Sequence, residues 1–112
     1  MSQRIVQKPW GEFETLIENS KCTVKVLYLD GGHRTSLQYH KKRVEYHKLI
    51  SGTCKLQLGK QMILLQTNHL IKIPKNKSHR ITAITNTIIL ELSIGSFNER
   101  DIVRLQDDYN RI

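Results

Sequence analysis

Residues 32–52 read GHRTSLQYHKKRVEYHKLISG, and this stretch carries most of what the sequence indicates about fold and chemistry. In a β-strand, residues two apart lie on the same face, so Gln38 and His40 should point in the same direction. The polar residues 41–43 suit a connection, after which Glu45 can reach the same place from the next strand. The stretch therefore predicts two neighbouring strands with polar side chains gathered on one face.

Apolar and polar residues alternate with period two along most of the chain. Residues 53–58 show this most clearly, because Cys54, Leu56 and Leu58 alternate with polar residues. Only residues 101–105 suggest a short helical turn, and the tail at 107–109, with two aspartates, suits a solvated terminus. Many short strands separated by turn residues predict a sandwich or barrel. Further strands are expected at 13–17, 23–29, 44–50, 62–65, 79–84 and 87–94.

Length and composition narrow the class of protein. The 112 residues suffice for one domain, 1–112, and no apolar run approaches the roughly 20 residues of a membrane helix. Without a secretory signal, and with Cys22 and Cys54 in apolar runs, we expect a soluble cytoplasmic protein with reduced cysteines and no membrane partner. The net charge of +8 favours an anionic partner. Because aromatic residues are sparse, we do not expect a nucleic acid as partner, and a phosphorylated metabolite is the anionic partner that we expect.

A fourth polar residue, His79, follows the corner at residues 74–78 and completes a candidate metal site. Imidazole, carboxylate and amide oxygen are nitrogen and oxygen donors that suit zinc, iron, manganese, cobalt or nickel. Three or four protein ligands leave positions for water or substrate. The predicted metal ligands are Gln38, His40, Glu45 and His79.

The spacing of these residues resembles the two motifs of the cupin superfamily. The first motif is matched by Gly32, Gln38, His40, Glu45 and Gly52, with glutamine in place of the first histidine. The second is matched by Asn68, Pro74, Asn76 and His79. Asparagine occupies both glycine positions of the second motif, and it tolerates the left-handed conformation better than other non-glycine residues. The resemblance implies an all-β fold, a small double-stranded β-helix or jelly-roll barrel, with one divalent metal on those ligands.

Further strings resemble one branch of that superfamily, the type II phosphomannose isomerase domain. This domain is often fused behind a mannose-1-phosphate guanylyltransferase. The matching strings lie at residues 8–11, 36–40, 43–45, 73–74, 79–80, 101–104 and 107–109. Trp10, in the first string, should pin the N-terminal segment against the barrel. Tyr46 and His47 depart from the histidine and tryptophan usual in the branch, so the pocket wall beside the metal should differ.

The resemblance implies a metal-dependent isomerase that interconverts mannose 6-phosphate and fructose 6-phosphate, with zinc as the first choice of metal. Glu45, His47 and Arg43 are the candidate catalytic residues, and Arg43, Lys41 and Arg104 are candidates for binding the substrate. His47 could also be a fifth ligand or a space-filling residue. The family further implies a homodimer.

Two other functions stay open at this point. The altered Tyr46-His47 pair suits a stand-alone domain that uses another phosphorylated or nucleotide-linked sugar. A domain without its guanylyltransferase suits a non-catalytic partner of a separate enzyme. His33 and His69 fall in turns and are interpreted as surface residues.

Overall fold

The computed structural model describes residues 4–15, 21–96, 98 and 100–112, and these form strands with no helix among them. The all-β prediction is confirmed. No helix in this part of the chain is long and apolar enough to cross a membrane. The strands are β1 Arg4–Lys8, β2 Gly11–Thr15, β3 Cys22–Leu29, β4 Leu37–Tyr39, β5 Arg43–Ser51, β6 Cys54–Leu58, β7 Gln61–Leu64, β8 Leu70–Ile73, β9 His79–Ala83, β10 Thr87–Gly95 and β11 Val103–Gln106.

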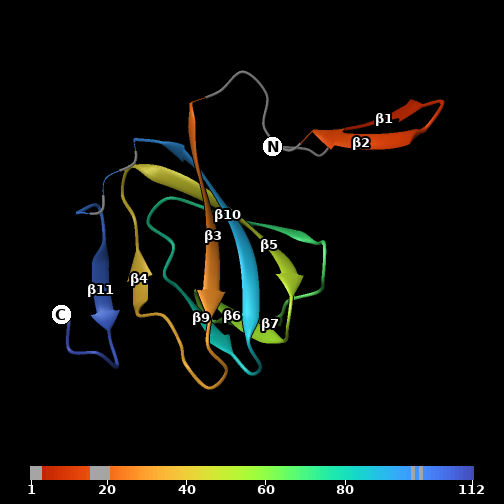
Figure 1. Ribbon diagram of the computed structural model, residues 1–112. Coiled ribbons are helices and arrows are strands. Elements are labelled where there is room, and N and C mark those ends of the chain that lie inside the picture. Colours follow the sequence, from red (N-terminus) through yellow and green to blue (C-terminus); the bar gives the residue numbers. More distant parts are fainter. Residues whose placement is uncertain (1–3, 16–20, 97, 99) are drawn as a thin grey trace.

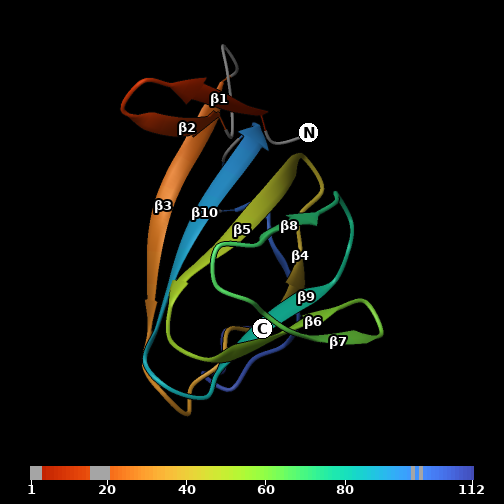
Figure 2. The ribbon, with the colours of Figure 1, turned by 90° about the vertical axis from the view of Figure 1, so that its right-hand side faces the viewer.

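Two antiparallel sheets face each other and enclose the interior (Figures 1 and 2). One sheet has the order β3-β10-β5-β8, and the other has the order β11-β4-β9-β6-β7. The chain crosses between the sheets repeatedly, so strands distant in sequence become neighbours. This arrangement places the start of β5 opposite the region where β4 and β9 meet, which decides where the site forms.

The interior has an apolar half and a polar half, because the inward-facing residues of individual strands are polar at one end and apolar at the other. Along β5, the inward side chains are Glu45 and His47, followed by Leu49. Along β10, Ile89 precedes Glu91 in the same alternation. Alternate residues share a face, so each strand contributes to both halves. The apolar half is a buried cluster of Leu49, Cys54, Leu56, Leu65, Ile73, Ile81 and Ile89.

Positive φ angles occur where the sequence predicts them. Asn68 and Asn76 have φ angles of 70° and 63°, which confirms the expected left-handed conformation at both motif positions. Gly52, at the β5–β6 corner, has a φ of 95°. These residues let the chain reverse sharply, and the corner that contains Asn76 leads directly into His79.

Two expectations fail. Residues 101–105 form no helix, because Val103 and Arg104 pair with β4 as part of β11. Trp10 does not pin the N-terminal segment to the barrel, since it lies in the turn of the separate β1–β2 hairpin and is 72% exposed. Asp108 and Tyr109 are exposed, as expected for a solvated terminus, and Asp108 accepts two hydrogen bonds from Arg34, at 2.7 and 2.8 Å. Of the predicted strand 13–17, residues 16 and 17 lie outside the described residues.

Candidate metal centre

The four predicted ligands come from both of the larger sheets. Gln38 lies on β4 and His40 directly follows that strand, whereas Glu45 lies on β5 of the opposite sheet. His79 is the first residue of β9 and pairs with Gln38 across the β4–β9 ladder. His40, Glu45 and His79 are buried, with at most 3% of each residue exposed. The structure thus brings the predicted set together.

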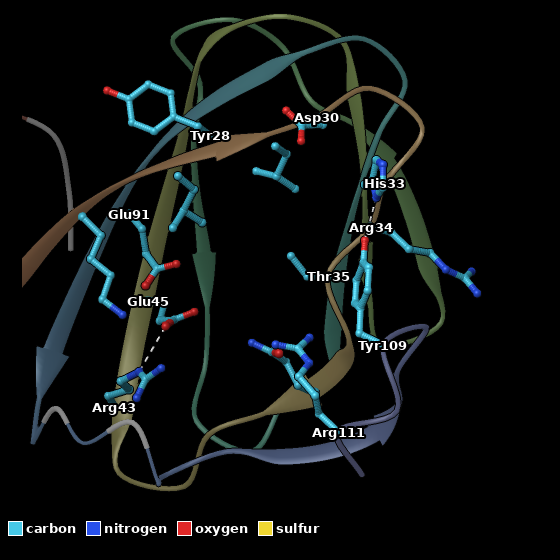
Figure 3. Close-up of a pocket in the computed structure, with 14 residues that line it drawn as sticks. Tyr28, Asp30, His33, Arg34, Thr35, Arg43, Glu45, Glu91, Tyr109 and Arg111 are labelled. Atoms are coloured by element: carbon cyan, nitrogen blue, oxygen red, sulfur yellow. Dashed lines mark hydrogen bonds and ion pairs between the residues drawn. The ribbon is translucent and has the colours of Figure 1, made fainter.

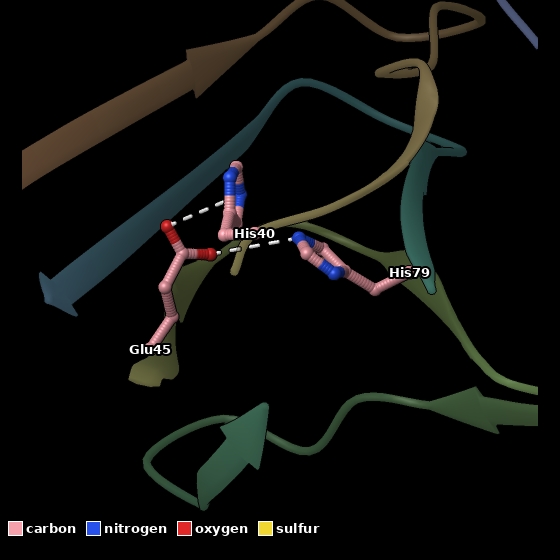
Figure 4. A group of neighbouring side chains, drawn as sticks. All are labelled: His40, Glu45 and His79. Carbon is pink, nitrogen blue, oxygen red and sulfur yellow. Dashed lines mark ion pairs between the residues drawn. The ribbon is translucent and has the colours of Figure 1, made fainter. Parts of the chain in front are cut away.

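The Glu45 carboxylate faces both imidazoles, one through each of its oxygens (Figure 4). Its Oε2 atom is 3.6 Å from His40 Nε2, and its Oε1 atom is 3.5 Å from His79 Nε2. The Gln38 amide nitrogen lies 3.4 Å from His40 Nε2, while the Gln38 oxygen accepts a hydrogen bond from the Ser36 hydroxyl. Rotation of the amide by about 180° exchanges the two atoms, so Gln38 can also present its oxygen here.

Backbone carbonyls determine which ring nitrogen of each histidine is free to bind a cation. His40 Nδ1 lies 2.6 Å from the Asp101 carbonyl oxygen, and His79 Nδ1 lies 3.0 Å from that of Lys77. A carbonyl only accepts, so each Nδ1 donates its proton and each Nε2 keeps a lone pair directed at Glu45. Within the described residues, buried His79 Nε2 has no hydrogen-bond partner. Metal-binding histidines typically show this arrangement, so the residues fit a divalent cation.

The electrostatics of the cluster favour the metal-binding protonation states of Glu45 and His40. Burial opposes ionisation of Glu45, but a hydrogen bond from His47 and the nearby imidazoles of His79 and His40 hold the pKa of this carboxyl well below its usual range. Burial lowers the pKa of His40, with the Arg43 charge acting in the same direction. A carboxylate beside neutral imidazole is the protonation state that a metal requires.

Arg43 lies inside this cluster rather than at the protein surface. It is 6% exposed, and its Nε donates a hydrogen bond of 3.0 Å to Glu45 Oε2. One terminal nitrogen lies 3.3 Å from His40 Nε2, and the other donates to the Asn98 carbonyl oxygen at 3.2 Å. The guanidinium therefore complements the charge of Glu45 and lines the cavity described next.

A cavity of about 480 Å³ opens beside the cluster (Figure 3). Gln38, Arg43 and Glu45 line its inner part. The volume falls within the roughly 300–1,000 Å³ of small-molecule sites. A cation bound to the cluster would therefore have an open side that faces a chamber large enough for a metabolite.

The other two predicted substrate-binding residues lie elsewhere. Lys41 is exposed, and its backbone N–H donates to the Asp101 carboxylate at 2.9 Å. Arg104 is half-buried on β11, opposite Gln38 in the β4–β11 ladder. Neither residue is among the described residues that line the cavity.

Sequence reasoning missed several residues of the cavity wall. Glu91, on β10, is 7% exposed and lines the cavity beside Glu45 (Figure 3). At the rim, exposed His33 bonds to the Tyr109 hydroxyl at 2.8 Å, and Arg111 lies over the Tyr109 ring. One signal was available for Glu91, because a carboxylate at an inward position of an otherwise apolar strand is costly without a partner.

A family model described as mannose-6-phosphate isomerase C-terminal matches residues 1–107. The chain belongs to this family. Among curated relatives, it is 32% identical over 111 residues to the xanthan biosynthesis protein XanB of Xanthomonas campestris. It is 34% identical over 110 residues to the alginate biosynthesis protein AlgA of Pseudomonas aeruginosa. These matches cover 96% and 95% of the chain but only 24% and 23% of the relatives, so the chain spans about a quarter of their length.

Solved structures confirm the cupin-type fold of this family member. Oxalate decarboxylase of Bacillus subtilis superposes with a TM-score of 0.69 at 20% identity, over 77% of this chain and 24% of that one. The capsular polysaccharide assembling protein CapF of Staphylococcus aureus superposes with a TM-score of 0.66 at 16% identity, over 94% of this chain and 34% of that one. At such identities the likeness concerns the fold alone.

Proposed function

We propose that this domain is a metal-dependent sugar-phosphate isomerase that interconverts mannose 6-phosphate and fructose 6-phosphate. The observation that carries the proposal is the buried group of His40, Glu45 and His79, with matched ring tautomers, beside a metabolite-sized cavity. Membership of the family supports the choice of substrate. Zinc is the metal we propose first, because imidazole and carboxylate ligands suit it.

Aldose to ketose conversion moves a proton between C1 and C2 and develops negative charge on the sugar oxygens. A divalent cation, when bound, stabilises negative charge on oxygen as a Lewis acid. Arg43 lines the inner cavity and contributes a second positive charge near the developing oxyanion. The net charge of +8 favours capture of a phosphorylated substrate.

The direct test is a coupled assay of fructose 6-phosphate formation from mannose 6-phosphate, using protein loaded separately with each divalent metal. We expect turnover with at least one of zinc, manganese, iron, cobalt and nickel. Absence of turnover with all of them would contradict the proposal. Saturation-transfer NMR with a panel of sugar phosphates and nucleotide sugars would then identify another substrate.

A second candidate function is that of a partner for a separate guanylyltransferase. It is favoured by the relatives named mannose-1-phosphate guanylyltransferase, such as one from Escherichia coli K12, of which the chain matches 23%. Co-purification from native lysate with such an enzyme, combined with no isomerase activity of the chain alone, would support this candidate.

We also propose a homodimer, because three large apolar side chains of edge strand β3, Val24, Val26 and Tyr28, are between 46% and 76% exposed. Light scattering that shows a monomer at micromolar concentration would contradict it. Cytoplasmic location stays a prediction from the sequence.

A further inference from the structure

Glu91 is a buried carboxylate that faces the cavity and lies outside the metal set. It projects from β10 beside Glu45, and both carboxylates line the cavity (Figure 3). Only 7% of Glu91 is exposed. A carboxylate in such a position requires a partner or a function, because burial of an uncompensated charge is costly.

The partner of Glu91 is His47, which lies directly opposite it in the β5–β10 ladder. His47 Nε2 is 3.5 Å from Glu91 Oε2 and 3.3 Å from Glu45 Oε1. Its Nδ1 is buried and, among the described residues, has no hydrogen-bond partner. His47 thus has the opposite proton arrangement to His40 and His79. Its Nε2 faces two carboxylate oxygens and must carry a proton to bond with them, whereas the Nε2 atoms of His40 and His79 keep a lone pair. This arrangement suits a residue that orients carboxylates. Glu45, His47 and Glu91 also lie close enough together to hold a cation, so metal content is measured in every variant below.

The remaining groups are less suited to exchange a proton with a substrate. Glu45 is held by Arg43 and faces the imidazoles of His40 and His79. His47 is 2% exposed and is not among the described residues that line the cavity. Among the described residues, two carboxylates outside the metal set line the cavity, Asp30 and Glu91. Asp30 is exposed at the rim, so Glu91 is the buried one, beside Glu45.

We propose that Glu91 is the catalytic base of the isomerisation and that His47 is its positioning residue. This inference rests on the proposed function. Glu91 takes the proton from C2 of the open-chain aldose, the C2–H electron pair forms the C1=C2 bond, and the C1=O π electrons move to O1. The C1=C2 electron pair then takes the same proton from Glu91 to form the new C1–H bond. The O2–H pair forms the C2 carbonyl, and the proton released from O2 passes to O1. The numbers of protons and electrons are unchanged overall.

The test compares Glu91→Gln, Glu91→Asp and His47→Gln with the full-length wild-type chain, all loaded with the same metal. Glu12→Gln, which removes an exposed carboxylate from β2, controls for the loss of one charge. Metal content, substrate binding by saturation-transfer NMR, kcat and KM are measured for each. Glu91→Gln should keep its metal and its binding of mannose 6-phosphate while kcat falls by about 100-fold or more.

The two other variants separate a catalytic role from a structural one. Glu91→Asp keeps a carboxylate at a greater distance, so it should retain part of kcat and show a larger isotope effect with substrate deuterated at C2. It also serves as the test if Glu91→Gln fails to fold. His47→Gln should lower kcat by about tenfold with little change in KM, since it changes the orientation of the base and not substrate binding.

Three outcomes would overturn the proposal. The first is that Glu91→Gln, or Glu91→Asp if the former does not fold, retains kcat within about threefold of the wild type. The second is that loss of kcat is accompanied by loss of metal, which would make Glu91 a ligand. An inactive wild type would overturn the proposed function and the base together, whereas an active wild type with an active Glu91→Gln would overturn the base alone.

Discussion

At His40 and His79, the backbone decides which ring nitrogen can bind a cation. Each Nδ1 is engaged by a carbonyl, of Asp101 and Lys77 respectively, so each Nε2 is directed at Glu45. The Asp101 side chain contributes too, because its carboxylate accepts hydrogen bonds from the amides of Lys41 and Lys42. These bonds hold the segment that follows His40.

We therefore expect Asp101→Ala to weaken metal binding although Asp101 is not a ligand. Loss of the two amide contacts would loosen the carbonyl that orients His40, and partners of this kind typically account for about 10–100-fold in affinity. Competition with a chromophoric chelator measures the effect. Asp30→Ala, an exposed change at the cavity rim, should leave the affinity unaltered. Equal affinities for Asp101→Ala and the wild type would contradict the explanation.

His47 predicts a pH dependence of the metal-free protein. Burial alone would lower its pKa, but hydrogen bonds to Glu45 and Glu91 and their charges outweigh burial and raise the pKa to about 9. A pKa raised on folding stabilises the folded state fully below the unfolded value of about 6.5, and this contribution is lost as pH rises toward 9.

The free energy of unfolding without metal should therefore fall between pH 6.5 and 9, by on the order of 3 kcal/mol. Urea titrations at several pH values measure the fall. It should be much smaller in His47→Gln and unchanged in His69→Gln, which alters an exposed histidine. Identical pH profiles for His47→Gln and the wild type would show that His47 does not carry the charge assigned to it.

At the residue scale, the sequence predicts the candidate ligands but not the side chains that surround them. The shared face of Gln38 and His40 follows from strand periodicity, and the structure places both beside Glu45. Glu91 was not predicted because its proximity depends on the pairing of β10 with β5, which periodicity within one strand cannot indicate.

At the scale of elements, tight corners determine where strands end. Gly52 has a φ of 95°, and a Cβ atom added there would overlap the Asn86 carbonyl oxygen and lie 2.8 Å from Thr87 Cα. Gly32 has a similar φ of 83°, yet nothing lies within 4 Å of its Cβ position. Substitution of Gly32 therefore measures the cost of backbone strain alone, whereas substitution of Gly52 adds the cost of steric overlap.

Gly32→Ala should lower the free energy of unfolding by about 1 kcal/mol, which is the cost of a left-handed conformation. Gly52→Ala should cost about 3 kcal/mol, because the backbone around residues 86 and 87 must also move. Chemical denaturation of both variants measures the difference. A cost for Gly52→Ala no larger than that for Gly32→Ala would contradict the packing described at this corner.

Element types were predictable where the pattern was local. Alternation identifies β3, β5, β6, β9 and β10 to within a residue or two. It fails for β11, whose four residues become a strand only because β4 offers an edge to pair with. Short segments carry too few residues for their own pattern to outweigh such long-range pairing.

At the scale of the whole molecule, the metal set joins the two sheets. Glu45 belongs to the four-stranded sheet, whereas Gln38 and His79 belong to the five-stranded sheet. A cation held by these residues would bind the folded state and not the unfolded chain. Binding of this kind stabilises a fold in proportion to the logarithm of ligand concentration.

Thermal unfolding should therefore shift upward with the concentration of added divalent metal. At 100 times the dissociation constant, the stabilisation should be about 2.7 kcal/mol. Differential scanning calorimetry measures the shift, and Glu45→Gln should reduce it. A melting temperature independent of metal in the wild type would show that the cation does not bridge the sheets.

The central claim is that His40, Glu45 and His79, with Gln38, form one metal centre. Elemental analysis of the purified wild-type protein and of a His40→Ala, His79→Ala double variant tests it most directly. His33→Ala, His69→Ala provides a matched control, because it removes two exposed imidazoles from turns. We predict about one divalent ion per chain in the wild type and the control, and essentially none in the double variant. Equal metal content in the double variant and the wild type would contradict the claim.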